Sequence, residues 1–399
     1  MPIVNRCFRI IISVTVCCFL AASPARAEDF PNVPGTVIHH SPASSGLFIG
    51  SPSIARLADG TLVASHDEFG PKSNEHVSAT TRVYASSDNG EHWEPIAKIQ
   101  GQFWSTLFVH RGVLYLIGTD RHHGHAIIRR SDDGGATWTT PNDASTGLLA
   151  EGQYHCAPQP VMVHQGRIWR AFEDAAGGMK WGERYRPLMI SAAVDADLLD
   201  RDSWTFTNYV TLDKSHLNGK MRGWLEGNAV VDPNGNINNI LRVEAGDMPG
   251  KAALMQVASD GKTIKFDPEQ GYIDLPGGSK KFTIRRDPQT GRYWTLVNWV
   301  MPEYADGRRA SQVRNTLALA SSTDLRDWQV HRVLIHDPDL GHGFQYADWL
   351  FDGADMIAVV RTATDDGLGG PHNYHDANFL TFHRIEDYAQ AVDEIAKPQ

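Results

Sequence analysis

The sequence is poor in cysteine, and this limits how the fold can be stabilised. Only four Cys occur in 399 residues, and Cys7, Cys17 and Cys18 all lie close to the N-terminus. Beyond that region Cys156 stands alone, so an intramolecular disulfide is excluded there. Nor are there cysteines enough for a thiolate zinc site. A large hydrophobic core must therefore supply the stability of the chain.

Positive charge is also in deficit. The chain has 37 Lys and Arg against 47 Asp and Glu, which gives a formal net charge of -10 and an isoelectric point near 6.0. This balance argues against nucleic acid or an anionic membrane as a partner. Long amphipathic helices, low-complexity tracts and Pro-rich linkers are missing too. Instead, Gly, Asp, Asn and Pro recur at short intervals between β-type runs, which predicts a single all-β domain.

The N-terminus has the pattern of a targeting signal. Arg6 and Arg9 precede an apolar stretch, residues 10–22, and Ala25-Arg26-Ala27 fits a small-x-small cleavage site. A membrane anchor is the alternative, but a spanning helix needs about 20 apolar residues. We therefore predict a signal peptide at residues 1–27 and a β domain at residues 28–399. The mature protein is expected to be secreted or periplasmic and free of the membrane.

One short pattern recurs along the chain. Ser131–Trp138 and Ser86–Trp93 share the skeleton Ser-x-Asp-x-Gly-x-x-Trp, and Ser322–Trp328 is a degenerate copy. Asp and Gly favour a tight hairpin turn in which the Asp side chain accepts hydrogen bonds from nearby backbone N–H groups. The Trp is expected to fold back over the hairpin as an apolar plug. We interpret the pattern as architectural and not catalytic.

This pattern resembles the Asp-box, or BNR repeat, of sialidase-like β-propellers. The resemblance implies blades of four antiparallel strands, A innermost to D outermost. Six A–B hairpins are expected at Ser51–His66, Trp104–Gly118, His155–Phe172, Glu226–Val243, Lys281–Asn298 and Gln345–Arg361. The sixth blade lacks an outer strand, which Gly35–His40 would supply and so close the ring. We predict one six-bladed β-propeller, with seven blades as the alternative.

In a propeller the B–C and D–A connections share one face, and here they carry an unusual set of side chains. The candidates on this face are His66, Asp67, His123, His125, His155, Arg170, Trp224, Glu226, Arg242, Tyr346 and Arg361. Arg170, Arg242 and Arg361 end equivalent strands in three blades and would converge on one anion. The alternative is that each is a surface charge or an ion pair between blades. Trp224 and Tyr346 are either sugar-stacking platforms or packing residues.

A more specific resemblance is to the propeller polysaccharide lyases, namely ulvan lyases and rhamnosyl-glucuronate lyases. It is carried by Ile49–Ile54, Ser65–Gly70, Tyr154–Pro158, Gly166–Glu173 and His375–Phe379. Those lyases use two His and an Arg, and the resemblance implies His125 (or His123), His155 and Arg242 for these roles. Sialidases instead open with Arg-Ile-Pro, where this chain has Ser51-Pro52-Ser53. They also need a Tyr–Glu pair, which cannot be singled out from the sequence, and an Asp acid, for which Asp67 is a candidate.

The leading functional hypothesis is a lyase that cleaves a uronic-acid-containing glycan by β-elimination. Arg242, with Arg170 and Arg361, would bind the uronate carboxylate. His155 or His125 would move the protons, with His66 assisting. Substrate would also contact His123, Asp67, Trp224, Glu226 and Tyr346. One alternative is a glycoside hydrolase of sialidase-like type acting on acidic or rhamnose-capped glycans, with carboxyl groups from Asp67, Glu173, Glu226 and Glu244.

The other alternative is a non-catalytic glycan-binding propeller. In every case the expected partner is an acidic oligo- or polysaccharide, and no cofactor is expected. His372 and His375-Asp376 are a candidate metal site, but two His without a dependable third ligand are weak evidence. We therefore predict no metal.

Overall fold

The computed structural model describes residue 1, residues 30–246, residue 248 and residues 250–394. Apart from its first residue, the predicted signal peptide lies outside the described residues. Within the part of the chain that is described, no helix combines the length and the apolar character needed to cross a membrane.

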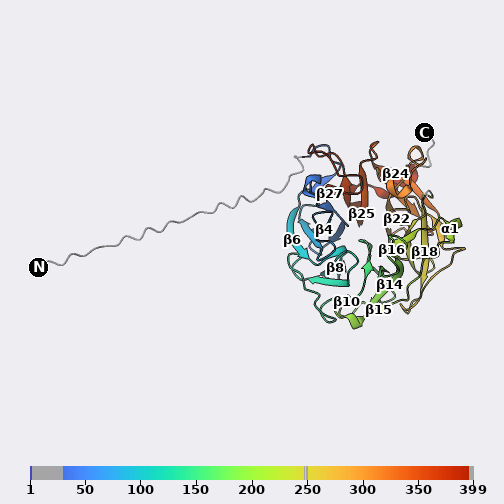
Figure 1. Ribbon diagram of the computed structural model, residues 1–399, viewed down its shortest axis with the longest axis horizontal. Coiled ribbons are helices and arrows are strands. Elements are labelled where there is room, and N and C mark those ends of the chain that lie inside the picture. Colours follow the sequence, from blue (N-terminus) through green and yellow to red (C-terminus); the bar gives the residue numbers. More distant parts are fainter. Residues whose placement is uncertain (2–29, 247, 249, 395–399) are drawn as a thin grey trace.

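Six antiparallel sheets are arranged around a central axis, so the protein is a six-bladed β-propeller (Figure 1). Each sheet is one blade, and the chain builds the blades in order. From the innermost strand outward, the first blade consists of β2 (Phe48–Ile49) with β3 (Ser53–Arg56), β4 (Leu62–Phe69), β5 (Thr80–Ser86) and β6 (Glu94–Gln100). The second consists of β7 (Phe103–His110), β8 (Val113–Thr119), β9 (Ala126–Ser131) and β10 (Leu148–Ala150). The third consists of β11 (Tyr154–His155) with β12 (Met162–His164), β13 (Arg167–Asp174), β14 (Arg186–Ala193) and β15 (Trp204–Phe206).

The remaining blades follow the same plan. The fourth blade consists of β16 (Gly223–Val231), β17 (Ile237–Glu244), β18 (Lys251–Val257) and β19 (Ile264–Phe266) with β20 (Tyr272–Asp274). The fifth consists of β21 (Thr283–Arg286), β22 (Tyr293–Asn298), β23 (Thr316–Ser322) and β24 (Trp328–His336). The sixth consists of β25 (Gly343–Asp352), β26 (Asp355–Ala363), β27 (Phe379–Ile385) and β1 (Thr36–His40). The helices are short: η2 (Ala43–Ser45), η3 (Arg201–Ser203), α1 (His216–Gly219), η4 (Pro302–Tyr304), η5 (Ala310–Gln312), η6 (Tyr388–Gln390) and α2 (Ala391–Glu394).

The N-terminal strand closes the ring as predicted. β1 pairs antiparallel with β27, with Thr36 opposite Phe382 and His40 opposite Phe379. The first described strand thus completes the last blade by pairing with a strand near the other end of the sequence. Without β1 the edge of β27 would present unpaired backbone groups.

The Asp-box motifs form the turns between the third and fourth strands of their blades. In the first box, Asp88 Oδ1 accepts from Ser86 Oγ at 2.8 Å and from the His92 backbone N at 3.0 Å. Trp93 Nε1 donates to the Gly90 carbonyl at 3.2 Å. The second box repeats these contacts with Asp133. In the degenerate third box, Leu325 adopts the left-handed conformation that Gly takes in the other two, with φ of 68°.

The Trp of each box does more than cover its own hairpin. Trp93 packs on Phe382 of the sixth blade, with ring centroids 5.6 Å apart. Trp138 lies against the apolar side chains of the first blade, and Trp328 against those of the fourth. The expected hairpin plug is therefore a contact between neighbouring blades.

The hydrophobic core is divided among the blade interfaces. Six clusters of buried side chains each join two adjacent sheets around the ring. The cluster between the second and third blades, for example, combines Ile117 and Ile128 with Ile168 and Phe172. This division explains why the strands are apolar on both faces, since each sheet is sandwiched between two others.

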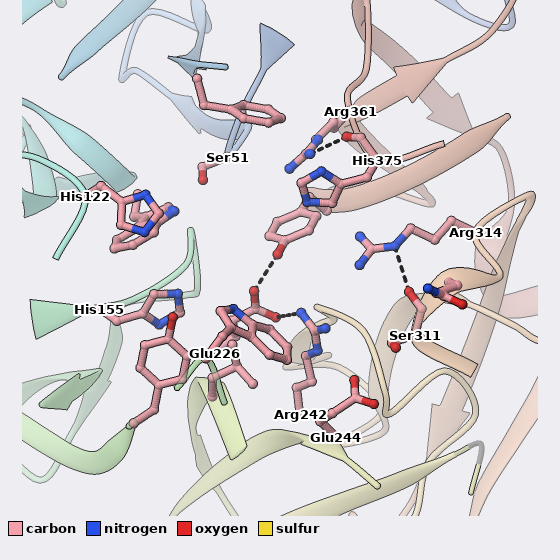
Figure 2. Close-up of a pocket in the computed structure, with 18 of the residues that line it drawn as sticks. Ser51, His122, His155, Glu226, Arg242, Glu244, Ser311, Arg314, Arg361 and His375 are labelled. Carbon is pink, nitrogen blue, oxygen red and sulfur yellow. Dashed lines mark hydrogen bonds and ion pairs between the residues drawn. The ribbon is translucent and has the colours of Figure 1, made fainter. Parts of the chain in front are cut away.

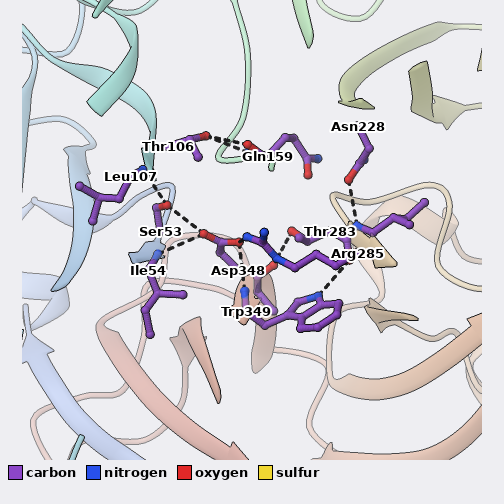
Figure 3. A network of polar contacts seen from close by, with 12 residues as sticks. Ser53, Ile54, Thr106, Leu107, Gln159, Asn228, Thr283, Arg285, Asp348 and Trp349 are labelled. Atoms are coloured by element: carbon purple, nitrogen blue, oxygen red, sulfur yellow. Dashed lines mark hydrogen bonds and ion pairs between the residues drawn. The ribbon is translucent and has the colours of Figure 1, made fainter. Parts of the chain in front are cut away.

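A belt of buried hydrogen bonds runs around the axis and joins every pair of neighbouring blades. Figure 3 shows most of its members. Its polar side chains all come from the innermost strands or their connections: Ser53, Thr106, Gln159, Asn228, Thr283 and Asp348. Asp348 closes the belt, because its carboxylate accepts from Ser53 Oγ at 2.8 Å and from the Ile54 backbone N at 3.1 Å. Buried polar groups must be paired in this way to avoid a desolvation cost.

Candidate functional site

The B–C and D–A connections of all six blades surround a central pocket of about 690 Å³ (Figure 2). This volume falls in the range of small-molecule binding sites. Arginines and histidines dominate its polar lining, although the whole chain is acidic. A basic pocket in an acidic protein favours an anionic ligand locally.

Three innermost strands begin with a β-bulge at the wall of this pocket. The register shifts after Phe103 in β7, after Leu225 in β16 and after Gln345 in β25. At each bulge a non-glycine residue is left-handed: Trp104 with φ of 50°, Glu226 with 61° and Tyr346 with 56°. Such conformations cost free energy and are concentrated at functional sites. All three residues line the pocket.

A buried titratable side chain from the preceding blade holds each bulge. Asp67 Oδ2 accepts from the Trp104 backbone N at 2.6 Å, and Glu173 Oε1 accepts from the Gly227 backbone N at 3.1 Å. Lys281 Nζ donates to the Ala347 carbonyl at 2.8 Å. The first, third and fifth blades thereby hold the bulges of the second, fourth and sixth. Burial raises the pKa of Asp67 to about 7 and lowers that of Lys281 to about 7.

The centre of the pocket is a hydrogen-bonded chain of Tyr346, Glu226 and Arg242 (Figure 2). Tyr346 Oη donates to Glu226 Oε1 at 2.5 Å, and Arg242 Nη1 donates to Glu226 Oε2 at 3.1 Å. Burial opposes ionisation of Glu226, but the charges of Arg242 and His155 outweigh it and lower the pKa of this carboxyl. Burial and the Glu226 charge raise the pKa of Tyr346. A neutral phenol therefore donates to a carboxylate base.

Two further guanidinium groups lie against the same phenol. The Arg361 guanidinium is 5.0 Å from the centroid of the Tyr346 ring and that of Arg314 is 5.9 Å away. Arg314 donates to Gln345 Oε1, and Arg361 donates to the His375 carbonyl. Burial lowers the pKa of Arg361 to about 10, which still leaves it charged at neutral pH. We call Arg242, Arg314 and Arg361 the Arg cluster; planar guanidinium groups of this kind bind carboxylates in a bidentate manner.

His122 and His155 occupy the wall opposite Arg314 and Arg361 (Figure 2). His155 Nδ1 lies 2.7 Å from Glu173 Oε2, and the imidazole packs edge-on against Trp104 at 4.3 Å. Glu173 thus orients His155 with one oxygen and holds the Glu226 bulge with the other. An imidazole oriented by a carboxylate is suited to proton transfer. His122 lines the same wall.

The structure brings together only part of the predicted site. His155, Glu226, Arg242, Tyr346 and Arg361 all line the central pocket. Asp67 and His123 are not among the lining residues but contact residues that are. Asp67 holds the backbone of Trp104, and His123 Nε2 lies 3.1 Å from the Tyr185 hydroxyl.

Four predicted site residues lie elsewhere. His66 is buried against Tyr84 and His39, and burial lowers its pKa to about 4. His125 lies outside the pocket lining, where its Nδ1 accepts from the Gly152 backbone N at 3.0 Å. Arg170 is fully buried and donates to the Ala157 and Ala171 carbonyls, so it does not share the position of Arg242 and Arg361. Trp224 is fully buried in the core between the third and fourth blades, packed on Phe266, so it cannot stack on a sugar.

Other pocket residues were not anticipated from the sequence. Arg314 lies in the connection between β22 and β23, where an isolated Arg gives no pattern. His122 adjoins the candidate His123, but its position in a polar loop does not single it out. The pairing of Tyr346 with Glu226 joins positions 120 residues apart, which no local motif reveals.

The fold is that of a sialidase-like six-bladed β-propeller. No protein-family model and no curated protein matches the sequence. Solved structures do match. The chain is similar to an α-L-arabinofuranosidase of Fusarium graminearum in complex with arabinobiose, at a TM-score of 0.55 and 13% identity over 87% of this chain and 96% of that one.

It is also similar to a Trypanosoma rangeli sialidase in complex with sialic acid, at a TM-score of 0.58 and 14% identity, covering 94% of this chain and 61% of the sialidase chain. A protein of unknown function from Dyadobacter fermentans matches at a TM-score of 0.58 and 13% identity, over 89% of this chain and 99% of that one. At these identities the likeness is one of fold.

Proposed function

We propose that this protein is a glycoside hydrolase that removes a carboxylate-bearing sugar from the end of a glycan, with Tyr346 as nucleophile. The observation that carries the proposal is the 2.5 Å hydrogen bond between the Tyr346 hydroxyl and Glu226, set against the Arg cluster. A pocket walled by all six blades suits a chain end better than a continuous polymer.

In the proposed reaction the Arg cluster binds the substrate's carboxylate. Glu226 takes the Tyr346 proton as the phenol oxygen bonds to the anomeric carbon, while His155 donates a proton to the departing glycosidic oxygen. Water then releases the sugar, with His155 acting as base and Tyr346 recovering its proton. A neutral phenol suits this task because the substrate's own carboxylate would repel a carboxylate nucleophile, and sialidases are the known exception that uses Tyr.

Resemblance to sialidases supports this reading in part. The Tyr–Glu pair that sialidases need has a counterpart in Tyr346 and Glu226. The Arg-Ile-Pro arginine has none, since Ser51 stands in that region. Arg361 supplies the third guanidinium from the sixth blade, whereas the Arg-Ile-Pro arginine of sialidases belongs to the first blade. We therefore infer that the substrate is a sugar acid whose carboxylate binds at a different position in the pocket from that of sialic acid.

A second candidate is the lyase predicted from the sequence. The observation that favours it is the His155–Glu173 pair facing Arg361 and Arg314 across the pocket. If a uronate carboxylate were bound by the Arg cluster, His155 would be placed to take the C5 proton. The product would then carry a conjugated double bond.

The test is a screen of aryl glycosides of sugar acids and of acidic polysaccharides, with products analysed by mass and ultraviolet absorption. Hydrolysis adds water across the cleaved bond, elimination does not, and a binding protein yields no product. Tyr346→Phe should lower hydrolytic turnover by about 10³-fold or more, as expected for loss of a nucleophile. A fluorinated substrate analogue should attach one sugar acid to the peptide containing Tyr346. Ultraviolet-absorbing products would overturn the hydrolase in favour of the lyase.

A further inference from the structure

A cluster of Glu75, His76 and His122 lies at the edge of the central pocket, and the proposed reaction does not use it. Glu75 and His76 belong to the connection between β4 and β5 of the first blade. His122 belongs to the connection between β8 and β9 of the second. Glu75 and His122 line the pocket. From this cluster we propose a binding site for one divalent transition-metal ion of the zinc class.

The ligand atoms have the spacing that such an ion requires. Glu75 Oε1 lies 3.2 Å from His76 Nε2 and 3.3 Å from His122 Nδ1. One ligand atom from each of the three residues lies within 4.8 Å of the other two. Zinc bonds of about 2.0–2.2 Å in tetrahedral geometry place neighbouring ligand atoms roughly 3.3–3.6 Å apart. Both imidazoles thus approach one carboxylate oxygen at the distances of a shared metal.

The other oxygen of Glu75 is already committed to orienting the carboxylate. Glu75 Oε2 accepts from the Gly70 backbone N at 3.0 Å and from Ser73 Oγ at 3.2 Å. The His122 backbone N donates to the Glu75 carbonyl at 2.6 Å, which ties the two connections together. Such contacts behind a ligand are what set its direction toward a metal.

Two imidazoles and one carboxylate form the donor set of zinc sites that keep a coordination position open. Structural zinc sites use four protein ligands, so three ligands leave one position for water or a ligand oxygen. Since Glu75 and His122 line the pocket, a metal held here would border on whatever the pocket binds. Imidazole and carboxylate together also suit cobalt and nickel.

A second group of similar composition provides a control. Asp88, Glu91 and His92 also gather around the first Asp-box turn. There, Asp88 Oδ1 is taken by Ser86 Oγ and the His92 backbone N, and His92 Nδ1 lies 2.7 Å from Oδ2. The Asp-box uses these contacts to form its turn, so this group should not bind metal.

The experiment measures binding of the metal alone, so it is independent of the proposed reaction. Tag-free, chelator-treated protein is titrated with zinc chloride in a calorimeter, and with cobalt chloride while the visible absorption of tetrahedral Co²⁺ is followed. One equivalent should bind. Loss of a residue that only hydrogen-bonds to a metal ligand weakens metal binding roughly 10–100-fold. Loss of a ligand itself should cost more, so His76→Ala and His122→Ala should each weaken zinc binding at least about 100-fold.

His76 is mostly exposed, so His76→Ala should fold normally and gives the sharper comparison. His92→Ala is the matched control and should bind zinc as the unaltered protein does. The proposal is overturned if neither metal binds with one-to-one stoichiometry, or if His76→Ala binds zinc as tightly as the unaltered chain. In either case the two imidazoles simply donate hydrogen bonds to Glu75.

Discussion

Arg242 has two partners in the proposed mechanism, the substrate's carboxylate and Glu226. In the resting protein it is the counter-ion of Glu226, and both side chains are almost fully buried. Burial works to lower the pKa of Arg242, but the charge of Glu226 outweighs it and raises that pKa. A change at Arg242 therefore affects stability as well as catalysis, which distinguishes it from an arginine that only contacts substrate.

We predict that Arg242→Met will lower the free energy of unfolding by about 3–5 kcal/mol, because it leaves the Glu226 carboxylate buried without its counter-ion. Urea denaturation followed by tryptophan fluorescence measures this. The double variant Arg242→Met with Glu226→Gln removes both charges and should recover part of the loss. If the double variant is as unstable as the sum of the two single changes, the ion pair is not the cause.

For His155 we predict a dependence on the leaving group. His155→Ala should lower turnover of a substrate with a poor leaving group by roughly 10²–10⁴-fold, the usual contribution of general acid catalysis. A nitrophenyl glycoside needs little protonation on departure, so its cleavage should be much less affected. Steady-state rates on the two substrates measure the contrast. An equal loss on both would assign His155 to positioning and not to proton donation.

Sequence patterns identified some of these residues because the ends of apolar strands can be recognised in the sequence. Arg242 and Arg361 close apolar B strands, and His155 opens an A strand, so each was expected on the correct face. The bulges were not readable. Trp224 and Glu226 are close neighbours in β16, yet the first packs in the core and the second lines the pocket, because the left-handed residue breaks the alternation of the strand.

At the scale of secondary-structure elements, the three bulges depend on buried titratable side chains of neighbouring blades. Asp67, Glu173 and Lys281 each bond to backbone at a bulge while buried from water. Asp67 and Glu173 were expected to act on substrate from the sequence. Their burial and their backbone partners instead make them positioning residues, and this follows from contacts between blades that a single sequence does not reveal.

We predict that Asp67 makes stability depend on pH. Its pKa is about 7 in the folded protein, raised by burial from 3.8. Between these values the folded state retains a proton that the unfolded state has lost, so this group's contribution to stability falls as pH rises from 3.8 to 7 and is constant above. Asp67→Asn removes this dependence. Urea denaturation measures the free energy of unfolding of both proteins at each pH. The value for the variant minus that for the unaltered protein should therefore rise between pH 3.8 and 7. A difference that does not change with pH would contradict the prediction.

The Asp-box hairpins yield a prediction on stability alone. Trp93→Ala should lower the free energy of unfolding by about 3–5 kcal/mol, because this buried ring fills the interface with the sixth blade. Trp138 is only half-buried, so Trp138→Ala should cost less. Activity per folded molecule should be unchanged in both, since the boxes lie on the face opposite the pocket. Loss of activity with full stability in Trp93→Ala would contradict this placement.

At the scale of the whole molecule, the fold was more predictable than the site. Six hairpins, the Asp-box turns and the closing strand all have local signals, and repetition makes each signal support the others. The outer strand of the second blade has no such signal, because β10 begins only at Leu148, after a connection that follows the Asp-box. The hydrogen-bond belt could not be foreseen, since the partners of residues such as Ser53 and Asn228 lie on neighbouring blades.

Ring closure by β1 gives the last prediction. Deletion of residues 28–41 removes the strand that pairs with β27 and with it the Ile38 contact in the core between the sixth and first blades. The exposed edge of β27 should promote association, and the loss of closure should lower the melting temperature. Light scattering and thermal unfolding measure these effects. A synthetic peptide of residues 30–42 should restore the monomer by pairing in trans, while a peptide of the same composition in scrambled order should not. A truncated protein that stays monomeric with unchanged melting would show that the first and sixth blades hold the ring together without β1.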